Sequence, residues 1–368
     1  MEGFSPHPRR ALGAVGAAVP WALLAGAVAA GLGHAPAVVR FVLAAAALVP
    51  LAKLLGDATE QLSARAGPVA AGLLNATCGN AAELIIAVFA LRRGLVEVVQ
   101  ASLSGSIIGN LLLVLGAALL AGGVRHPVQK FSALGAESQI ASLALAVFAL
   151  LFPAVFFHLA RLGHREDLAI PLSVSVAAVL LAVYGAALFF SLRTHRHLLG
   201  VGSHRMPRWS VRTATLRLLA AAAGTALASE VLVGCLDEVS HSLGLGAVFM
   251  GVVVVAVLGN AAEHAAGVML AWRNEMDAAL SVCFSSSLQV ALFVTPLLVL
   301  LSIPLGHPMS LVFTAVEVIA VAAAVALAGL VTLNGESNWL EGVQLLALYV
   351  IVALCLAFLP AGDALRRL

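Results

Sequence analysis

Eleven apolar stretches, each near the length that an α-helix needs to cross the hydrocarbon core of a bilayer, constrain this chain more than any other feature. Hydrophobic residues make up 62% of the sequence and charged residues 10%, too little polar material to cover a soluble globule of 368 residues. Uninterrupted apolar runs do not fit the alternation of a membrane β-barrel. The sequence therefore predicts an all-α membrane protein with 11 transmembrane helices, near residues 13–33, 36–55, 68–91, 98–122, 133–157, 168–192, 213–235, 245–272, 278–303, 309–333 and 341–359.

Basic residues indicate how the chain enters the membrane. With a cytoplasmic N-terminus, most of the Lys and Arg residues fall on the cytoplasmic face, as the positive-inside rule requires, and the C-terminus lies outside. The first span follows Arg9 and Arg10, but no polar mature domain comes after it, so we interpret it as a retained helix rather than a cleaved signal peptide. The alanine-rich, compact chain favours a bacterial inner membrane. Nothing in it resembles a nucleic-acid-binding patch.

The motif GNAAE occurs twice, beginning at Gly79 and at Gly259, 180 residues apart. Ser106 and Ser286 share the same offset. We therefore expect two copies of a five-helix unit, and because five is odd, the second copy must be inverted in the membrane. The predicted organisation is a tail with one extra helix (1–35), a first repeat (36–192), a cytoplasmic basic linker (193–212), a second repeat (213–360) and a C-terminal tail (361–368).

Glu83 and Glu263 fall near the middle of their spans, where an ionised carboxylate costs on the order of 3 kcal/mol. Neither span offers a lysine or arginine at that depth. A protonated glutamic acid that hydrogen-bonds another helix would also fit either position. Two acids at the same position of the two motifs favour a functional role instead, since one shared cation would compensate both charges.

Neutral oxygen donors surround these acids in the sequence. Asn75, Gly79 and Glu83 lie at i, i+4 and i+8, on one stripe of a helix. Asn80 and Asn260 either bind the ion or cap a broken turn. Such hard ligands suit Ca²⁺ better than Mg²⁺, and no separate cofactor is expected. The predicted ion-binding set is Glu83, Glu263, Gly79, Asn80, Gly259, Asn260, Ser106, Ser286, Gln289 and Asn110, with Glu83 and Glu263 as the metal ligands.

Four further ionisable residues fall within the apolar spans. His264 stands beside Glu263, and its counterpart in the first half is a leucine, so it is either a hydrogen-bonding neighbour or a proton carrier. Glu137 and Glu317 share the 180-residue offset and lie nearer an interface, and Glu230 has no acidic counterpart. We predict either proton relay and gating or a structural role for these three acids.

The stretches GLLNATCGNAAELIIAVFAL and GNAAEHAAGVMLAWRNEMDAALSVCFSSSLQVALFV resemble the two signature repeats of the calcium/cation–proton antiporter (CAX) family. The tail NGESNWLEGVQLLALYVIVALCLAFLP is similar to the last two helices of that family. The resemblance covers roughly residues 50–360 and implies the fold of sodium/calcium exchangers, with a site centred on Glu83 and Glu263. The chain departs from the family at Ala82, where threonine is common, at Gly109, where serine is common, and in its basic rather than acidic linker.

The sequence thus predicts a secondary transporter, not an enzyme, that exchanges Ca²⁺ for H⁺ by alternating access. A sodium, potassium or manganese/proton exchanger on the same scaffold is the nearest alternative. An intramembrane hydrolase using Glu263 and His264 is a rival of another class, but the His-Glu-x-x-His zinc motif is absent from the sequence. A channel is the third alternative.

Overall fold

The computed structural model describes residues 8–66, 68–160, 165–190 and 208–359. Most of the predicted basic linker and the predicted C-terminal tail lie outside the described residues. The helices of the first half are α1 (Pro8–Leu32), α2 (Ala37–Ser63), α3 (Pro68–Cys78), α4 (Ala81–Arg92), α5 (Val96–Ile108), η1 (Gly109–Val114), α6 (Leu115–Arg125), α7 (Ala133–Leu159) and α8 (Glu166–Phe189). Those of the second half are α9 (Val211–Leu243), α10 (Ala247–Phe249), η3 (Met250–Val255), α11 (Ala256–Gly259), α12 (Ala261–Trp272), α13 (Met276–Gln289), η4 (Val290–Val294), α14 (Thr295–Ser302), α15 (Ala315–Thr332) and α16 (Trp339–Ala357).

The prediction of a helical membrane protein is confirmed. Within the described residues, eight unbroken helices are long and apolar enough to cross a membrane, and a ninth span is a helix pair bent by 65°. Two of the eleven predicted spans, at 68–91 and 245–272, are each broken in the middle. The first predicted span lies in the continuous helix α1, of which Ala18–Leu32 is a shorter apolar helix. The total of eleven transmembrane helices stays a prediction.

Local sequence explains where several helices begin and end. Ser210 accepts a hydrogen bond from the Thr213 amide and starts α9, which continues to Gly244, a glycine in the left-handed conformation at φ 67°. The predicted span at 309–333 begins late, at Ala315, because the preceding segment contains two prolines and a left-handed glycine, Gly306. The short strands β1 (Gln129–Lys130) and β2 (Glu336–Ser337) pair antiparallel and join two of the loops.

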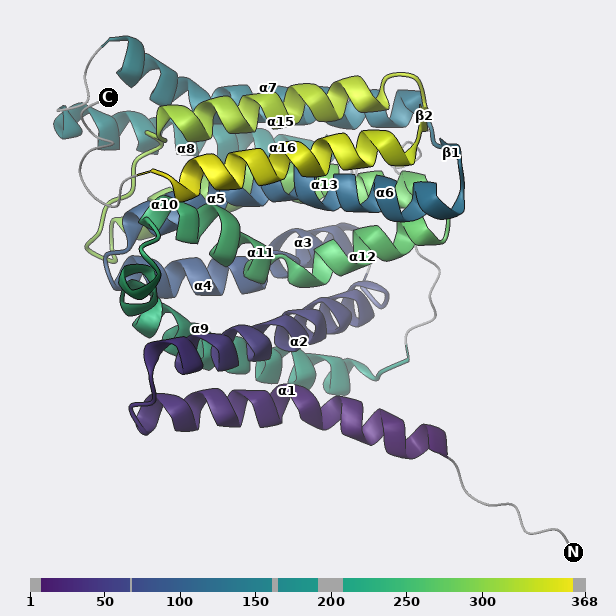
Figure 1. The fold of residues 1–368 in the computed structure, drawn as a ribbon, viewed down its shortest axis with the longest axis vertical. Coiled ribbons are helices and arrows are strands. Elements are labelled where there is room, and N and C mark those ends of the chain that lie inside the picture. The colour runs from purple at the N-terminus through teal and green to yellow at the C-terminus, as the bar shows by residue number, and fades with distance from the viewer. Residues whose placement is uncertain (1–7, 67, 161–164, 191–207, 360–368) are drawn as a thin grey trace, which may run out of the picture.

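The helices lie roughly side by side in one bundle (Figure 1). Helix α1 forms one edge and packs against α2 and α9, while α7, α8 and α15 lie at the opposite edge. The N-terminal end of α1 and the C-terminal end of α16 lie at opposite ends of the bundle (Figure 1). The two broken helices, α3–α4 and α10–α12, pass through the middle of this arrangement, between α2 and α5.

Helix α5 and the π-helix η3 approach each other closely through glycines. A Cβ atom added to Gly105 would lie 2.5 Å from the backbone of Val252, and one added to Gly251 would lie 2.6 Å from the Val98 carbonyl oxygen. Such distances leave no room for a side chain, so the two helices contact backbone to backbone. This contact fixes the position of α5, which carries Ser106 of the predicted site.

We predict that Gly105→Ala destabilises the protein by about 1–3 kcal/mol, because its methyl group must displace the η3 backbone. Gly185→Ala is the matched control, since a Cβ there meets no atom within 4 Å. Thermal unfolding of both variants in the same detergent measures the difference. Equal unfolding temperatures for the two variants would contradict the backbone contact.

Candidate ion-binding site

Both GNAAE motifs break a helix. The first break lies at Gly79–Asn80, between α3 and α4, and the second at Asn260, between α11 and α12. Asn80 (φ −92°, ψ 18°) and Asn260 (φ −102°, ψ 6°) adopt the sparsely populated bridge conformation. Glu83 and Glu263 therefore stand in the first turns of α4 and α12, where the unpaired N–H groups and the helix dipole favour a negative charge.

Glu83 is held by donors from two other helices. Its Oε1 accepts a hydrogen bond of 2.6 Å from the Ser106 hydroxyl on α5 and one of 2.5 Å from the Asn260 amide. The same amide nitrogen lies 2.9 Å from the Ser106 oxygen. Asn260 belongs to the second half of the chain and Glu83 to the first. The two halves thus complete one another at this carboxylate.

Contacts on the other side of the site also join the two halves. Asn80 donates to Gln289 Oε1 over 2.5 Å, and Asn110 donates to the Ser286 hydroxyl over 3.0 Å. Ser286 lies within hydrogen-bonding reach of the Glu263 carboxylate. Neither Asn80 nor Asn260 caps the helix that follows it with its side chain. A side-chain cap of the following helix is therefore wrong for both asparagines. Asn260 Nδ2 does donate to the Ala256 carbonyl oxygen of the turn before the break, over 3.0 Å.

Three side-chain oxygens of this cluster are buried and lack a hydrogen-bond partner within the described structure: Glu83 Oε2, Glu263 Oε2 and Asn80 Oδ1. A buried polar atom without a partner is costly unless something else binds it. Glu83 and Glu263 line one cavity of about 130 Å³, together with Gly79, Gly259 and Asn260. Two carboxylates and an amide oxygen are the hard donors that Ca²⁺ prefers.

The cavity has a wall that sequence reasoning missed. Ala52, Leu55, Gly56 and Thr59 of α2 line it, yet none of them carries a charge that marks it in the sequence. They reach the site because α2 packs across α11 and α12. Gly56 and Asn75 are exposed, so the cavity extends to the surface on their side.

The remaining predicted residues are the four candidates for proton handling or gating. His264 follows Glu263 on α12, and its Nε2 is buried without a hydrogen-bond partner in the described structure. Glu137 and Glu230 have exposed side chains on α7 and α9. Glu317 is buried, but it contacts Ser104 and Thr314 and not the cavity. Roles in proton handling stay predictions for all four.

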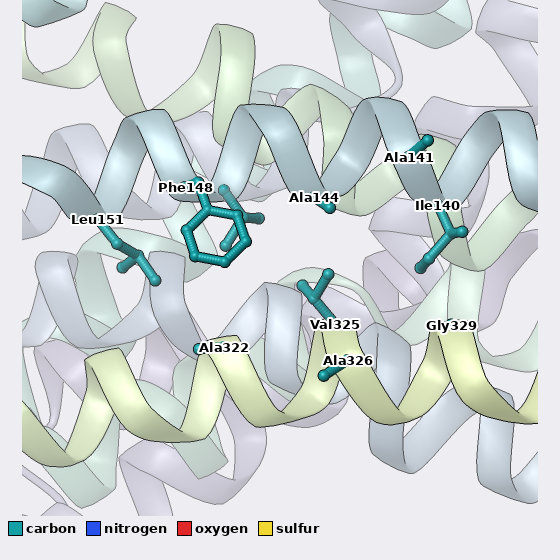
Figure 2. A pocket seen from close by; sticks show the side chains of 10 residues that line it. Ile140, Ala141, Ala144, Phe148, Leu151, Ala322, Val325, Ala326 and Gly329 are labelled. Carbon is teal, nitrogen blue, oxygen red and sulfur yellow. The ribbon is translucent and has the colours of Figure 1, made fainter.

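A larger pocket of about 260 Å³ lies elsewhere, between α7 and α15 (Figure 2). All of its lining side chains are apolar, from Ile140 and Ala141 at one end to Phe148 and Leu151 at the other. Without a carboxylate, hydroxyl or amide side chain, this pocket offers no side-chain ligand for a cation. The smaller cavity between Glu83 and Glu263 is therefore the candidate site.

Comparison with known proteins agrees with this geometry. The pattern of the family described as sodium/calcium exchanger protein matches residues 36–193 and 213–358. The chain is 45% identical over 339 residues to a Ca²⁺/H⁺ antiporter of Synechocystis, covering 87% of this chain and 91% of that protein. This protein belongs to the sodium/calcium exchanger family, in its Ca²⁺/H⁺ antiporter (CAX) branch. The predicted resemblance and the prediction of a transporter rather than an enzyme are thereby confirmed.

One further sequence relative and two solved structures support the family assignment and the fold of this protein. It is 41% identical to the Ca²⁺/H⁺ antiporter ChaA of Bacillus subtilis, covering 87% of this chain and 92% of that one. The structure of native YfkE superposes with a TM-score of 0.82 at 37% identity, covering 94% of this chain and 100% of that chain. The crystal structure of the H⁺/Ca²⁺ exchanger CAX shares the fold at 16% identity, with a TM-score of 0.73, covering 97% of this chain and 90% of that chain.

Gly259→Ala tests the approach of the two halves at the site. The new Cβ would lie 3.0 Å from Glu83 Cγ, so the glutamate must move by a few tenths of an ångström and weaken its bonds to Ser106 and Asn260. Loss of about one hydrogen bond predicts a roughly 5-fold weaker affinity for Ca²⁺, measured by calorimetric titration. Gly26→Ala on α1, where a Cβ meets no atom within 4 Å, is the control. Unchanged affinity in Gly259→Ala would argue against a Glu83-centred site.

Proposed function

We propose that this protein exchanges Ca²⁺ for H⁺ across a membrane, with both ions competing for Glu83 and Glu263. The observation that carries the proposal is the pair of buried, unpartnered carboxylate oxygens that line one cavity. The names of its bacterial relatives, which are Ca²⁺/H⁺ antiporters, support the same function. This exchange is secondary active transport of calcium.

Competition at the carboxylates would couple the two ions. A carboxyl group that has bound a proton no longer offers a negative charge to Ca²⁺, so each ion displaces the other from the same oxygens. Ser106, Ser286, Asn110 and Gln289, together with the broken-helix residues Gly79, Asn80, Gly259 and Asn260, would supply or orient the neutral donors. Because neither span offers a lysine or arginine at the depth of the acids, the empty site without protons is the costly state.

The cavities support access from one side at a time. The cavity of about 130 Å³ is lined by Ala52, Leu55, Gly56 and Thr59, in the second half of α2. The C-terminal end of α2 lies at the end of the bundle that holds the N-terminal end of α1 (Figure 1). On the other side of Glu83, a space of about 10 Å³ lies among Ile86, Leu103 and Val255. That space holds about one water molecule and blocks a hydrated ion. In the proposed cycle this side opens when the first closes.

An inverted repeat would supply the second conformation. Helix α4 runs from its break toward one end of the bundle, and α12 runs from its break toward the other (Figure 1). The π-helices η1 (Gly109–Val114) and η4 (Val290–Val294) begin 181 residues apart and end 180 residues apart. The family pattern also matches the chain in two separate segments. These features support two oppositely oriented five-helix units that exchange conformations about the central site.

The proposed location is a bacterial plasma membrane with a cytoplasmic N-terminus. The relatives from bacteria support this location. The distribution of basic residues supports the orientation. The open cavity would then face the cytoplasm. This direction suits a carrier that collects Ca²⁺ from the cytoplasm and releases it outside in exchange for protons.

The cation that the protein prefers separates the proposed Ca²⁺/H⁺ exchange from its nearest alternative, exchange of another cation for H⁺. Rice relatives at 36% identity are called vacuolar cation/proton exchangers, a broader description than calcium alone. Sealed vesicles with an imposed pH gradient test the preference directly. Ca²⁺ uptake that an excess of Mn²⁺, Na⁺ or K⁺ leaves unchanged supports calcium, whereas proton-driven uptake of one of those ions in place of Ca²⁺ supports the alternative.

Glu83→Gln and Glu263→Gln should each abolish Ca²⁺/H⁺ exchange in such vesicles. Either change removes half of the negative charge of the site while keeping the shape of the side chain. Glu275→Gln, at an exposed position before α13, is the matched control and should transport normally. Size-exclusion profiles of the purified variants show whether each is folded. Wild-type exchange by either site variant would refute the two-carboxylate mechanism.

Calcium affinity should fall as pH falls, because bound protons must leave before Ca²⁺ binds. At a pH where both acids hold protons, the slope of the logarithm of Ca²⁺ affinity against pH should approach two. By linkage, each Ca²⁺ that binds then releases two protons. Titration of detergent-solubilised protein in weakly buffered medium measures this release. Glu263→Gln should flatten the slope. An affinity independent of pH, without proton release, would instead indicate a channel or a simple cation site.

A further inference from the structure

Helix α5 presents hydrogen-bonding side chains on two opposite faces. Ser102 and Ser106 lie one turn apart and face the site, where both line the small space beside Glu83. Gln100 and Ser104 also lie one turn apart, but they are rotated by about 200° from that pair. The second face contacts the segment that begins α15. One helix thus connects the ion site to a distant buried carboxylate.

That carboxylate is Glu317, which is only 3% exposed. Its Oε1 accepts a 2.6 Å hydrogen bond from Ser104, shorter than the 3.0 Å from the same hydroxyl to the Ala101 carbonyl oxygen. Its Oε2 accepts bonds of 2.7 Å from the Thr314 hydroxyl and 3.0 Å from the Thr314 amide. One turn away on α5, Gln100 donates to the Ser310 carbonyl oxygen over 2.7 Å.

The matching pair of helices, α13 and α7, has no copy of this arrangement within the described residues. The residues of α13 that correspond to Gln100 and Ser104 are Leu280 and Phe284, which cannot hydrogen-bond. Glu137, which corresponds to Glu317, is exposed. The two serines at the site therefore differ in support. The helix of Ser106 is tied to Glu317 through Ser104, and α13 offers no hydrogen-bonding side chain at the matched positions.

We propose that Glu317 is a positioning residue for the ion site. By holding Ser104 it fixes the rotation of α5 about its axis, and this rotation keeps the Ser106 hydroxyl on Glu83 Oε1. A helix is stiff across two residues, so a turn of α5 that releases Ser104 also moves Ser106 away from Glu83. Glu317 thereby sets the affinity for Ca²⁺ without contacting the ion, an inference that rests on the proposed function.

A double-mutant cycle tests this connection. Glu317→Gln should weaken Ca²⁺ binding roughly 5-fold by calorimetric titration, about the effect of one hydrogen bond. Combined with Ser106→Ala, it should cause no further loss, because the group through which it acts is gone. Combined with Ser286→Ala, the matched serine on α13, the two losses should multiply. Losses that multiply in both backgrounds, or wild-type affinity in Glu317→Gln, would overturn the proposal.

Ser104→Ala provides a second variant that leaves the Thr314–Glu317 cap of α15 intact. It should weaken Ca²⁺ binding as much as Glu317→Gln does, and the two changes together should weaken it no further. Should Glu317→Gln fail to fold, Ser104→Ala combined with Ser106→Ala or Ser286→Ala repeats the cycle. Ser104→Ala with wild-type affinity would overturn the proposal in that case.

A readout without calcium separates this inference from the proposed function. Wild-type protein that binds no Ca²⁺ would refute the function, and amide hydrogen exchange over residues 96–108 then decides the role of Glu317. Both Glu317→Gln and Ser104→Ala should speed exchange in that segment, since α5 loses an attachment. Exchange at the wild-type rate in both variants would show that Glu317 does not hold α5.

Discussion

The cost of placing two carboxylates inside a membrane without a basic partner shapes the centre of this protein. Breaking the helices at Asn80 and Asn260 puts Glu83 and Glu263 at helix N-termini, where free N–H groups favour negative charge. Hydroxyl and amide donors satisfy one oxygen of Glu83, and its second oxygen has no partner in the described structure. In the proposed mechanism, a proton or a cation satisfies what the protein leaves unsatisfied, and exchange follows from that incomplete compensation.

The two halves are chemically incomplete when taken apart. Glu83 needs Asn260, Asn80 meets Gln289, and Asn110 meets Ser286, so each contact crosses from one half to the other. Moving one half against the other therefore changes the environment of the carboxylates directly. This arrangement gives a physical route by which a conformational change alters ion affinity, since the same hydrogen bonds hold the halves together and complete the site.

Departures from the repeat are as informative as its matches. Gln289 stands where the first half has Gly109, and buried Glu317 stands where the first half has exposed Glu137. The hydrogen bond from Asn80 to Gln289 depends on the first difference, and the attachment of α5 depends on the second. The two halves, which share matching motifs, are therefore supported differently at the site.

Sequence alone determined the helical membrane class and predicted the pair of acids and the oxygen-rich set around them, because hydrophobic length and intramembrane charge are properties of a local segment. It also placed the glycine–asparagine motifs at the site. It did not show that these motifs break their helices, that α2 supplies a wall of the cavity, or that Glu317 caps α15 and binds Ser104. Those features depend on which faces of distant helices meet. Only tertiary packing decides that, because apolar helices of similar composition fit together in many ways until close contacts, such as Gly105 against Val252, select one.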